Sequence, residues 1–496
     1  MRIGLLGSRV LHPRESTLGR VIAVLGGHVL PLIASLVAFP TMFHALGAGR
    51  FGFFMLVWTI AGYAGILDLG LSRAFTRHVA QNKEGEPEGL GRLFWTGQVA
   101  LIAFGAALAS VLALLSGAIA QLAGADSGMR AEAVASFRAL ALCVPFLGAV
   151  SAARGVLEGY ERFDLVTAAR IPTGVLSAVT PLAVVVLGGD LTAAVASLAA
   201  VRILTYAVFL TLCLKIQPGL RAVGLRWSSG LKGLLAYGGW VGVSNVVGPI
   251  IVNVDRFLLG ALAGIAAVSY YATAFEAQNR LLILVTALTT VLFPAMASDT
   301  QGGGASASLL RLGNRATLGV LFPVCLTLVA FGPELLAAWM GREFASEASG
   351  VWRWLVVGVF VNGIAQTPFA YLQAIGRARS TALLHLAEIL PYLTILSILA
   401  LAFGAEGAAA AWTFRAGADC LVLMVMSSRS ARVGLPPETI CAGLATALLA
   451  LFLLDLSLTA RVVLFLAFLI GFLPLAWKWV LSNAQRIAIR RVLNGI

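Results

Sequence analysis

Long uninterrupted apolar runs recur along the whole 496-residue chain, and they decide its fold class. Only 11% of the residues are charged while 59% are hydrophobic, which leaves too little polar surface for a soluble globular protein. A helix needs about twenty apolar residues to cross the ~30 Å hydrocarbon layer, whereas the strands of a membrane barrel alternate over about ten residues. Because the runs have the helical length, the sequence predicts an all-α polytopic membrane protein.

Fourteen of these runs are long enough to cross a membrane, and their even number places both termini on the same side. The predicted crossings are residues 21–43, 52–73, 93–115, 134–156, 166–187, 192–214, 234–258, 264–296, 316–336, 350–372, 380–402, 407–428, 438–456 and 461–481. The segment before them carries four arginines and no small-residue cleavage site, so we expect a retained tail over residues 1–20 rather than a removed signal peptide.

The Lys and Arg residues are divided unequally between the two sides of this topology. Of the 35, the termini and the loops on their side hold 25 and the opposite loops hold 6, while 4 fall inside crossings. Since positive residues favour the cytoplasmic side, both termini are predicted to be cytoplasmic. The net charge of +13 is spread over short loops rather than gathered in one basic domain, so we exclude nucleic-acid binding.

An internal repeat is visible when the chain is shifted along itself by 215 positions. The shift places Val144, Gly148, Leu157 and Arg162 on Val359, Gly363, Leu372 and Arg377. Chance identity between Leu-, Ala- and Gly-rich helices is the alternative explanation. We predict two six-helix repeats of the same topology around a central cavity, over residues 21–232 and 233–432. Residues 433–496 then form two additional helices and a cytoplasmic tail.

No catalytic or phosphate-binding motif accompanies the crossings. The sequence has no H-E-x-x-H, G-x-S-x-G or G-x-x-x-x-G-K-[ST] pattern, and its loops are too short to hold a catalytic domain. The five cysteines stand singly in apolar segments, without any C-x-x-C pair. The sequence therefore predicts that the protein is not an enzyme and has neither a metal site nor a cofactor.

The most specific pattern lies in residues 46–80. It comprises Leu46-Gly47, Phe51-Gly52, Leu56, Trp58, Gly62-Tyr63, Asp68-Leu69-Gly70-Leu71, Arg73-Ala74 and Arg77. This pattern resembles the second membrane helix of bacterial polysaccharide flippases, the O-antigen-type lipid-linked oligosaccharide transporters of the multidrug/oligosaccharidyl-lipid/polysaccharide exporter superfamily. The resemblance implies a multi-pass protein of the bacterial inner membrane. It also implies a lipid-linked oligosaccharide substrate, with polysaccharide polymerase and chain-length machinery as partners.

Asp68 ends the apolar part of this stretch, near the far side of the membrane. An unpaired carboxylate at membrane depth is costly, so Arg73 or Arg77 is its expected partner, and both side chains can extend to the headgroups. The family resemblance favours a gating role for these three residues. An ordinary helix end with charges at the interface is the alternative.

Three arginines, Arg202, Arg280 and Arg415, fall near the middle of predicted crossings, and a fourth, Arg256, is expected at an outer helix end beside Asp255. Ionisable residues inside a membrane are candidates for a transport path, so three cations at one depth predict a path for an anion. Carboxylates stand at i,i+4 spacing in the pairs Glu276/Arg280 and Arg415/Asp419. The alternative is that these pairs only neutralise each other within the bundle.

Further polar side chains gather around the same crossings. Asn279 belongs to the polar run from Glu276 to Arg280, whose density predicts a water-filled cavity rather than a dry interface. Asn245 and Asn362 add neutral groups suited to sugar hydroxyls, although such residues often make packing contacts between helices.

His385 and Glu388 form an i,i+3 pair in the predicted eleventh crossing. Because histidine titrates near neutral pH, this pair suggests a proton-coupling site. A packed polar pair without any role in coupling is the alternative.

Three functions remain open. The first is a flippase that moves a polyprenyl-diphosphate-linked oligosaccharide from the cytoplasmic to the periplasmic leaflet for assembly of a cell-surface polysaccharide. The second is a cation-coupled small-molecule or multidrug antiporter of the same superfamily, and the third is a membrane scaffold without transport. The intramembrane arginines outnumber their predicted carboxylate partners by one, which favours an anionic diphosphate over a cationic drug.

Overall fold

The computed structural model describes residues 17–62, 71–81, 87–221, 253–298, 305–431 and 437–479. These ranges are helical apart from short turns and contain no strand. Within them, nine helical stretches are long and apolar enough to cross a membrane. The prediction of an all-α polytopic membrane protein is confirmed. Residues 234–252 of the predicted crossing over 234–258 lie outside the described residues.

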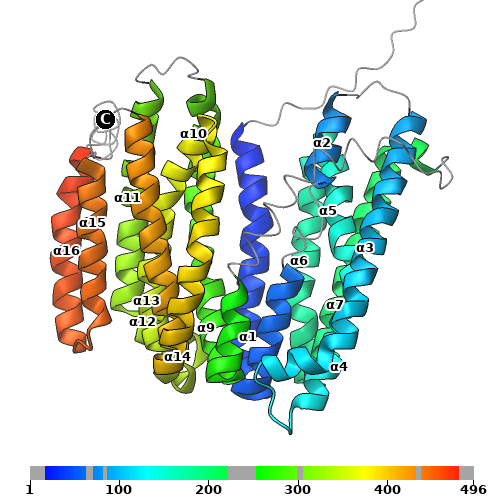
Figure 1. Ribbon diagram of the computed structural model, residues 1–496, viewed down its shortest axis with the longest axis horizontal. Helices are drawn as coiled ribbons and strands as arrows, with labels where there is room; N and C mark the ends of the chain where they lie inside the picture. Colours follow the sequence, from blue (N-terminus) through cyan, green and yellow to red (C-terminus); the bar gives the residue numbers. More distant parts are fainter. Residues whose placement is uncertain are drawn as a thin grey trace, which may run out of the picture.

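The helices lie side by side along the bundle (Figure 1). In the first part of the chain they are α1 (Thr17–Gly62), α2 (Leu71–Gln81), α3 (Pro87–Leu122), α4 (Arg130–Ala141), α5 (Val144–Gly159), α6 (Phe163–Val186), α7 (Leu191–Ile216) and the short η2 (Pro218–Arg221). A helical segment over residues 253–263 follows. The remaining helices are α9 (Ile265–Asn279), α10 (Leu282–Ser298), α11 (Ala305–Ala330), α12 (Gly332–Met340), α13 (Arg342–Ala374), α14 (Ala378–Ser430), α15 (Pro437–Ala450), η3 (Leu451–Leu453) and α16 (Leu458–Trp479).

Two of these helices are each divided by one glycine with left-handed backbone. Gly47 (φ 74°) breaks α1, and Gly404 (φ 57°) breaks α14 into a first arm, residues 378–403, and a second arm, residues 405–430. Residues with a Cβ rarely adopt this conformation, so glycine permits the chain to reverse without a loop. The two arms of α14 therefore run side by side in opposite directions.

Residues with positive φ recur at nearly the same spacing in the two parts of the chain. The pairs are Gly47 and Gly264, Gly124 and Gly341, Glu161 and Gly376, and Gly188 and Gly404. Regular recurrence of the turns supports the proposed organisation in two repeats around a pseudo-symmetry axis. The boundaries of the repeats themselves stay a prediction.

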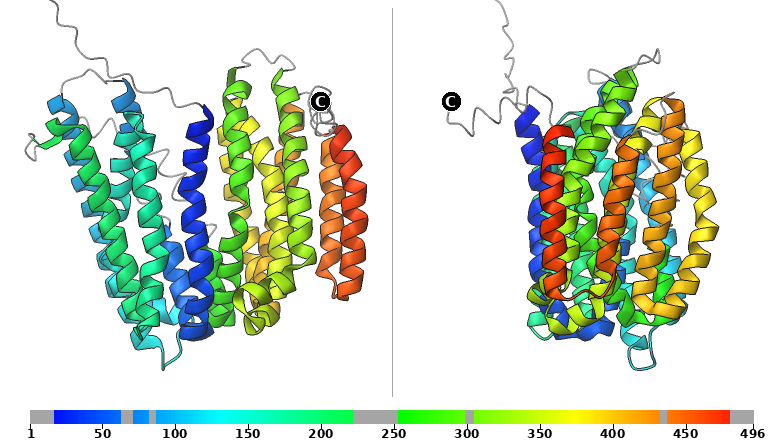
Figure 2. Two further views of the ribbon diagram at one scale, coloured as in Figure 1. Left: turned by 180° about the vertical axis from the view of Figure 1, so that it is seen from behind. Right: turned by 90° about the vertical axis from the view of Figure 1, so that its left-hand side faces the viewer.

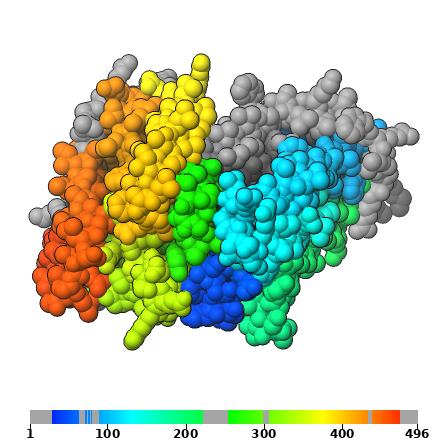
Figure 3. Space-filling view, turned by 60° about the horizontal axis from the view of Figure 1, so that its bottom comes forward, coloured from blue at the N-terminus to red at the C-terminus, as the bar shows by residue number. Residues whose placement is uncertain are grey.

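The helices α1 to α7 form one half of the molecule and α9 to α14 the other, with α15 and α16 at its outer side (Figures 1 and 2). The breaks and connections at six of the seven left-handed glycines in the described ranges gather at one end of the bundle, which we call the turn end: Gly47, Gly124, Gly188, Gly264, Gly341 and Gly404. Seen toward this end, α9 lies directly against α1 (Figure 3). The halves thus meet closely here.

Close packing at the turn end depends on small and aromatic side chains. A Cβ at Gly52 would lie 2.2 Å from the backbone oxygen of Ile265, so only glycine allows α1 and α9 to approach this far. The rings of Phe43 and Phe344 meet edge to face at 5.1 Å. Trp339 on α12 donates a hydrogen bond of 2.7 Å to the backbone oxygen of Leu36. These contacts join the two halves and form a floor beneath the candidate site.

Ion pairs hold the last two helices to the second half. Arg461 on α16 makes a bidentate pair with Glu334 on α12, at 2.6 and 2.9 Å. At the other end of the bundle, Arg315 on α11 lies 2.6 Å from Glu438, whose side chain is almost fully buried. Buried charges need such partners, which explains why α15 and α16 pack on α11 and α12 in one fixed position.

Candidate substrate site between the two halves

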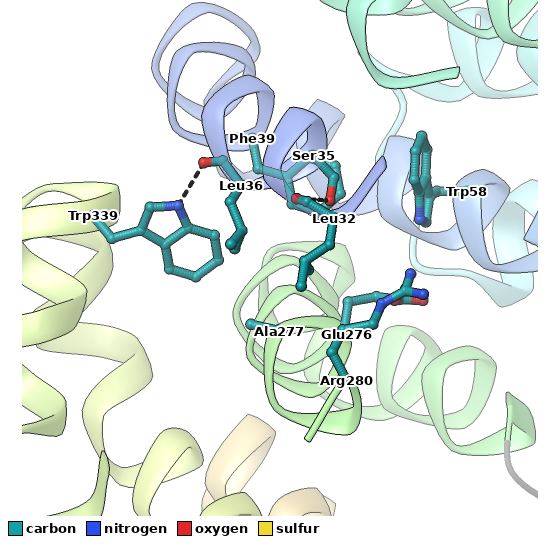
Figure 4. A pocket seen from close by; sticks show the side chains of 9 residues that line it. All are labelled: Leu32, Ser35, Leu36, Phe39, Trp58, Glu276, Ala277, Arg280 and Trp339. Carbon is teal, nitrogen blue, oxygen red and sulfur yellow. Dashed lines mark hydrogen bonds and ion pairs between the residues drawn. The ribbon is translucent and has the colours of Figure 1, made fainter. Parts of the chain in front are cut away.

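A pocket lies between the halves, above the contacts of the turn end (Figure 4). Its lining residues are Leu32, Ser35, Leu36, Phe39 and Trp58 of α1, Glu276, Ala277 and Arg280 at the end of α9, and Trp339 of α12. The empty space is about 230 Å³ with its opening included. The enclosed part measures only about 10 Å³, which is room for about one water molecule, so a larger group can bind here only when the halves move apart.

Arg280 supplies the positive charge of this pocket. Its Nη2 lies 3.0 Å from the Glu276 carboxylate, which confirms the predicted i,i+4 pair. The arginine side chain remains 38% exposed despite that contact. One face of the guanidinium can therefore meet a second anion while Glu276 holds the other.

The predicted crossing over residues 264–296 agrees with one apolar stretch at Ile265–Ala297 that is long enough to span a membrane, but its helix is interrupted at Arg280, which lies in a turn between α9 and α10. The backbone N–H of Leu281 donates to the oxygen of Gln278, and that of Ile283 donates to the oxygen of Arg280. These i,i+3 bonds tighten the chain and replace the regular helical pattern. The Gln278 side chain anchors the turn by donating 3.0 Å to the Trp352 backbone oxygen on α13.

A second arginine, which belongs to the first half, lies within electrostatic range of Arg280. Arg170, on α6, is exposed and interacts electrostatically with Arg280, as well as with Arg154 and Glu158 of α5. Arg154 lies 3.4 Å from Glu158 on the same helix. Both halves therefore contribute cations to the space between them.

Sequence reasoning counted Arg154 and Arg170 among the loop charges of the cytoplasmic side and missed this arrangement. The structure extends α5 to Gly159 and begins α6 at Phe163, so both arginines belong to helices. The available signal was the apolar sequence on both sides of Arg170, from Leu165 to Leu176. An arginine within such a run is a candidate for the membrane interior.

A separate polar network lies inside the second half, and it corrects two predicted pairs. Arg415 lies 3.4 Å from Glu388, and His385 Nε2 lies 3.5 Å from Asp419 Oδ1. The expected pairs Arg415/Asp419 and His385/Glu388 are therefore wrong as the principal contacts. Because Gly404 folds the arms of α14 against each other, residues on opposite arms come closer than residues one turn apart on the same arm.

The network continues from Arg415 to the segment 253–263. The Arg415 guanidinium lies over the ring of Tyr392 at 5.4 Å, and the Tyr392 hydroxyl lies 3.4 Å from Asp255 Oδ2. The hydroxyl of Tyr271 donates to the same oxygen at 2.5 Å. Asp255 is fully buried, which a carboxylate tolerates only with such partners.

Arg256, which the sequence predicts at an outer helix end, is also fully buried. Its guanidinium donates to the side-chain oxygen of Asn253 and lies 4.8 Å from the centre of the Phe275 ring. An aromatic face and an amide oxygen stabilise a guanidinium away from water. The sequence showed the charge but not the ring and amide that surround it.

The three arginines predicted to share one anion path are held in different places. Arg280 lines the pocket between the halves, Arg415 belongs to the network of the second half, and Arg202 lies on α7 near Cys143 in the first half. Each arginine falls near the middle of a predicted crossing, but this position did not predict the direction in which its side chain points.

The remaining candidates are less informative about the site. Asn279 ends α9 beside Arg280 and is half-buried, and Asn362 is half-buried on α13. Asn245 and Asp68 lie outside the described residues, as do the side chains of Arg73 and Arg77 on α2. The gating role of the last three stays a prediction. In the described ranges, no three His, Cys, Asp or Glu side chains are grouped as a metal site.

Comparison with known proteins agrees with this architecture. The family described as polysaccharide biosynthesis protein matches residues 18–299. A relative from Shigella flexneri named "Putative O-antigen transporter" is 27% identical over 412 residues, which are 82% of this chain and 96% of that protein.

Two solved structures share the fold. The lipid II flippase MurJ in an inward closed conformation superposes with a TM-score of 0.73 at 13% identity, over 93% of this chain and 99% of that one. A multidrug resistance MATE family transporter in an inward-facing conformation gives 0.70 at 13% identity, over 83% and 98%. The resemblance inferred from residues 46–80 is confirmed, and the chain belongs to the polysaccharide biosynthesis protein family.

Proposed function

We propose that this protein is a flippase, which moves a polyprenyl-diphosphate-linked oligosaccharide from the cytoplasmic to the periplasmic leaflet of a bacterial inner membrane. The observation that carries the proposal is the position of Arg280 in the pocket between the halves, together with its electrostatic interaction with Arg170. Polysaccharide polymerase and chain-length machinery would then act on the lipid-linked product at the periplasmic face.

The charge of the site suits a diphosphate. Arg154 pairs with Glu158 and Arg280 with Glu276, and Arg170 interacts electrostatically with Arg154, Glu158 and Arg280, so this group has one positive charge in excess before a substrate binds. Guanidinium groups bind phosphate oxygens through two parallel hydrogen bonds, and such charge-assisted bonds are strong in a poorly hydrated site. The diphosphate would enter the pocket when the halves move apart, while the sugars and the prenyl chain would extend beyond it.

The closed turn end gives the proposed transport its direction. In the orientation predicted from the Lys and Arg distribution, the turn end is periplasmic. The contacts of Gly52 with Ile265 and of Phe43 with Phe344 would then close the periplasmic exit. A substrate bound at Arg280 would enter from the cytoplasmic side and leave after these contacts separate.

A small-molecule antiporter is the second candidate. Phe39, Trp58 and Trp339 line the pocket, and aromatic rings favour flat cationic drugs. However, among the described residues Glu276 is the only carboxylate in the lining, and it is already paired with Arg280. A cationic drug would have to displace a guanidinium, so the anionic substrate is favoured.

Depletion of the protein in its own cell separates the two candidates. The flippase predicts that lipid-linked oligosaccharide accumulates in the cytoplasmic leaflet, which an impermeant sugar-modifying reagent would detect as protected material. The antiporter predicts unchanged lipid sidedness and lost resistance to drugs.

Expression of variants in the depleted cell then tests whether an arginine of the first half is needed for transport. Arg170→Gln should fail to restore normal sidedness, because it removes the arginine that interacts electrostatically with Arg280. Arg162→Gln is the matched control, since Arg162 pairs with Asp164 at the start of α6, outside the pocket. Full rescue by Arg170→Gln would remove this residue from the proposed site.

A further inference from the structure

We propose that the hydrogen bond from the Trp339 indole to the backbone oxygen of Leu36, which we call the latch, couples the pocket at Arg280 to the closed turn end. The bond joins α12 of the second half to α1, and the Trp339 ring also lines the pocket (Figure 4). A group that enters the pocket would displace the ring, break the bond and release the turn end. The inference rests on the proposed function only for the identity of that group.

Pro40 creates the acceptor of the latch. In an α-helix the backbone oxygen of Leu36 accepts a hydrogen bond from the N–H of residue 40. Proline has no N–H, and Pro40 lies inside α1, so this oxygen lacks its helical donor. A backbone oxygen inside a membrane helix needs another partner, because lipid supplies none. The position of the proline therefore explains why α1 presents a backbone acceptor beside the pocket.

Trp339 supplies the missing donor from the other half. Its Nε1 lies 2.7 Å from the oxygen of Leu36, although the two residues are 303 positions apart in the chain. Both residues are half-buried. When the halves part, the donor and the acceptor must each find water or another partner. The bond therefore favours the closed arrangement of the halves.

The second half holds α12 in place. Glu334, in the first turn of this short helix, makes the bidentate pair with Arg461 of α16. The turn after α12 also contacts α1, since a Cβ at Gly341 would lie 2.9 Å from His44 Nε2. Because α12 is fixed to α16, it does not follow α1 when the halves part. Opening of the turn end must then break the latch.

The Trp339 ring is the part of the pocket lining that can move most easily. Leu36 and Phe39 belong to the continuous helix α1, and the turn at Arg280 is anchored to α13 through the Gln278 side chain. The indole of Trp339 is held to α1 by the latch alone among the hydrogen bonds of the pocket lining. Since the enclosed space has room for about one water molecule, an anion on Arg280 requires some part of the lining to move.

Release of the latch would reach the closed contacts of the turn end. Phe43, which meets Phe344 edge to face, lies about two turns beyond Leu36 on the same helix. The closed state has the indole on the Leu36 oxygen, and the open state has it released. A ligand shifts such an equilibrium only if it binds one state better. Here the ligand and the closed position of the ring compete for the same space, so the ligand favours opening.

Radical footprinting of the purified full-length protein tests the latch without any substrate. Hydroxyl radicals oxidise methionines that water can reach, and mass spectrometry locates the oxidation. Met42 of α1 and Met340 of α12 are fully buried near the turn end, so their oxidation reports its opening. Trp339→Phe keeps an aromatic ring but loses the N–H. The oxidation rate of both methionines should rise roughly two- to tenfold, which corresponds to the loss of one hydrogen bond.

Trp95→Phe is the matched control. The Trp95 indole donates at 2.8 Å to the backbone oxygen of Leu220, so this variant loses a bond of the same kind inside the first half. It should leave the oxidation of Met42 and Met340 at the native rate. Unchanged oxidation in Trp339→Phe, or an equal rise in Trp95→Phe, would overturn the latch.

Pro40→Ala tests the acceptor. Alanine gives the Leu36 oxygen a helical N–H, so loss of the indole no longer leaves that oxygen without a donor. Trp339→Phe should therefore add little to the oxidation of the Pro40→Ala protein. The comparison of single and double variants separates the hydrogen bond from any effect of the proline on the shape of α1. An equal rise in both backgrounds would overturn the assignment of the Leu36 oxygen as the acceptor of the latch.

Inorganic diphosphate tests the connection between the latch and the pocket. Its addition should raise the oxidation of Met42 and Met340 in the native protein. It should have no effect in Arg280→Ala, which lacks the binding cation, and little effect in Trp339→Phe, which is already released. A native protein that stays protected in diphosphate would overturn the coupling of the pocket to the turn end. The sidedness of the lipid in depleted cells decides the proposed function separately, so failure of one leaves the other intact.

Discussion

The Arg415 guanidinium lies 3.4 Å from Glu388 on the opposite arm of α14, whereas Asp419, one helical turn from Arg415, contacts His385. Sequence spacing alone pairs Arg415 with Asp419, since residues at i,i+4 share a helix face. The turn at Gly404 brings a second helix to that face and changes the partner. The preference of Arg415 for Glu388 over Asp419 can be measured by comparing the stabilities of single and double variants.

Arg415→Gln should destabilise the protein by about 3–5 kcal/mol, because it leaves the mostly buried Glu388 without its cation. Adding Glu388→Gln should restore most of the lost stability, and adding Asp419→Asn should restore less. Thermal unfolding of the purified protein in detergent measures all three variants. Equal recovery by the two second substitutions would show that Arg415 does not prefer Glu388.

Gly52→Ala should weaken the contact between the halves at the turn end. The new Cβ would collide with the backbone oxygen of Ile265, so α1 and α9 must separate. Cysteines placed at Phe43 and Phe344 report this separation as a lower yield of cross-link. Gly62→Ala, in the same helix with open space around its Cβ, is the control and should leave the yield unchanged.

Glu334→Gln should lower the unfolding temperature more than Arg461→Gln does. The first change leaves the buried Arg461 side chain, 8% exposed, without its carboxylate, while the second leaves Glu334, 44% exposed, in contact with water. The hydrogen bonds from Arg461 hold the pKa of Glu334 below its usual value. The stabilisation from this pair is therefore complete above the ordinary carboxyl pKa and is lost as acid lowers the pH through the depressed value. Equal effects of the two substitutions would contradict this account of how α16 is held.

The predicted orientation can be tested from outside intact cells. A cysteine at Ser127, exposed at the turn end, should react with an impermeant thiol reagent. A cysteine at Lys215, exposed at the opposite end of α7, should react only after the membrane is opened. Labelling in the reverse order would place the termini in the periplasm and reverse the proposed direction of transport.

Much of the fold follows from the sequence, because apolar length and glycine position act locally. The long runs predicted helices, and a left-handed glycine such as Gly404 marks where a helix reverses. Local rules also predicted the Glu276/Arg280 pair. They failed where a partner comes from another helix, as at Arg415.

The candidate site was predictable only in part for the same reason. Arg280 was recognised from its depth and its polar neighbours, whereas Arg170 gained its importance from its electrostatic interaction with Arg280, which is distant in sequence. The turn at Arg280 could not be predicted, since neither proline nor glycine marks it and the Gln278 contact with Trp352 is distant in sequence. Side-chain direction across an interface depends on packing that no local pattern records.

The central claim is that Arg280 carries the diphosphate and that Glu276 holds this arginine when the site is empty. Arg280→Lys keeps the charge but loses the planar fork, so it should transport weakly, and Arg280→Ala should transport hardly at all. Either variant leaves Glu276 without its guanidinium. A change that removes both charges avoids this complication.

The most direct measurement is therefore the flipping rate of Glu276→Gln/Arg280→Gln in vesicles that contain the lipid-linked oligosaccharide. Arg342→Gln, which removes an exposed arginine at the turn end, serves as the control. The account predicts that the double variant inserts and unfolds like the native protein but moves no lipid, while the control keeps the native rate. Flipping at the native rate by the double variant would show that the Glu276/Arg280 pair is structural and would contradict the proposed substrate site.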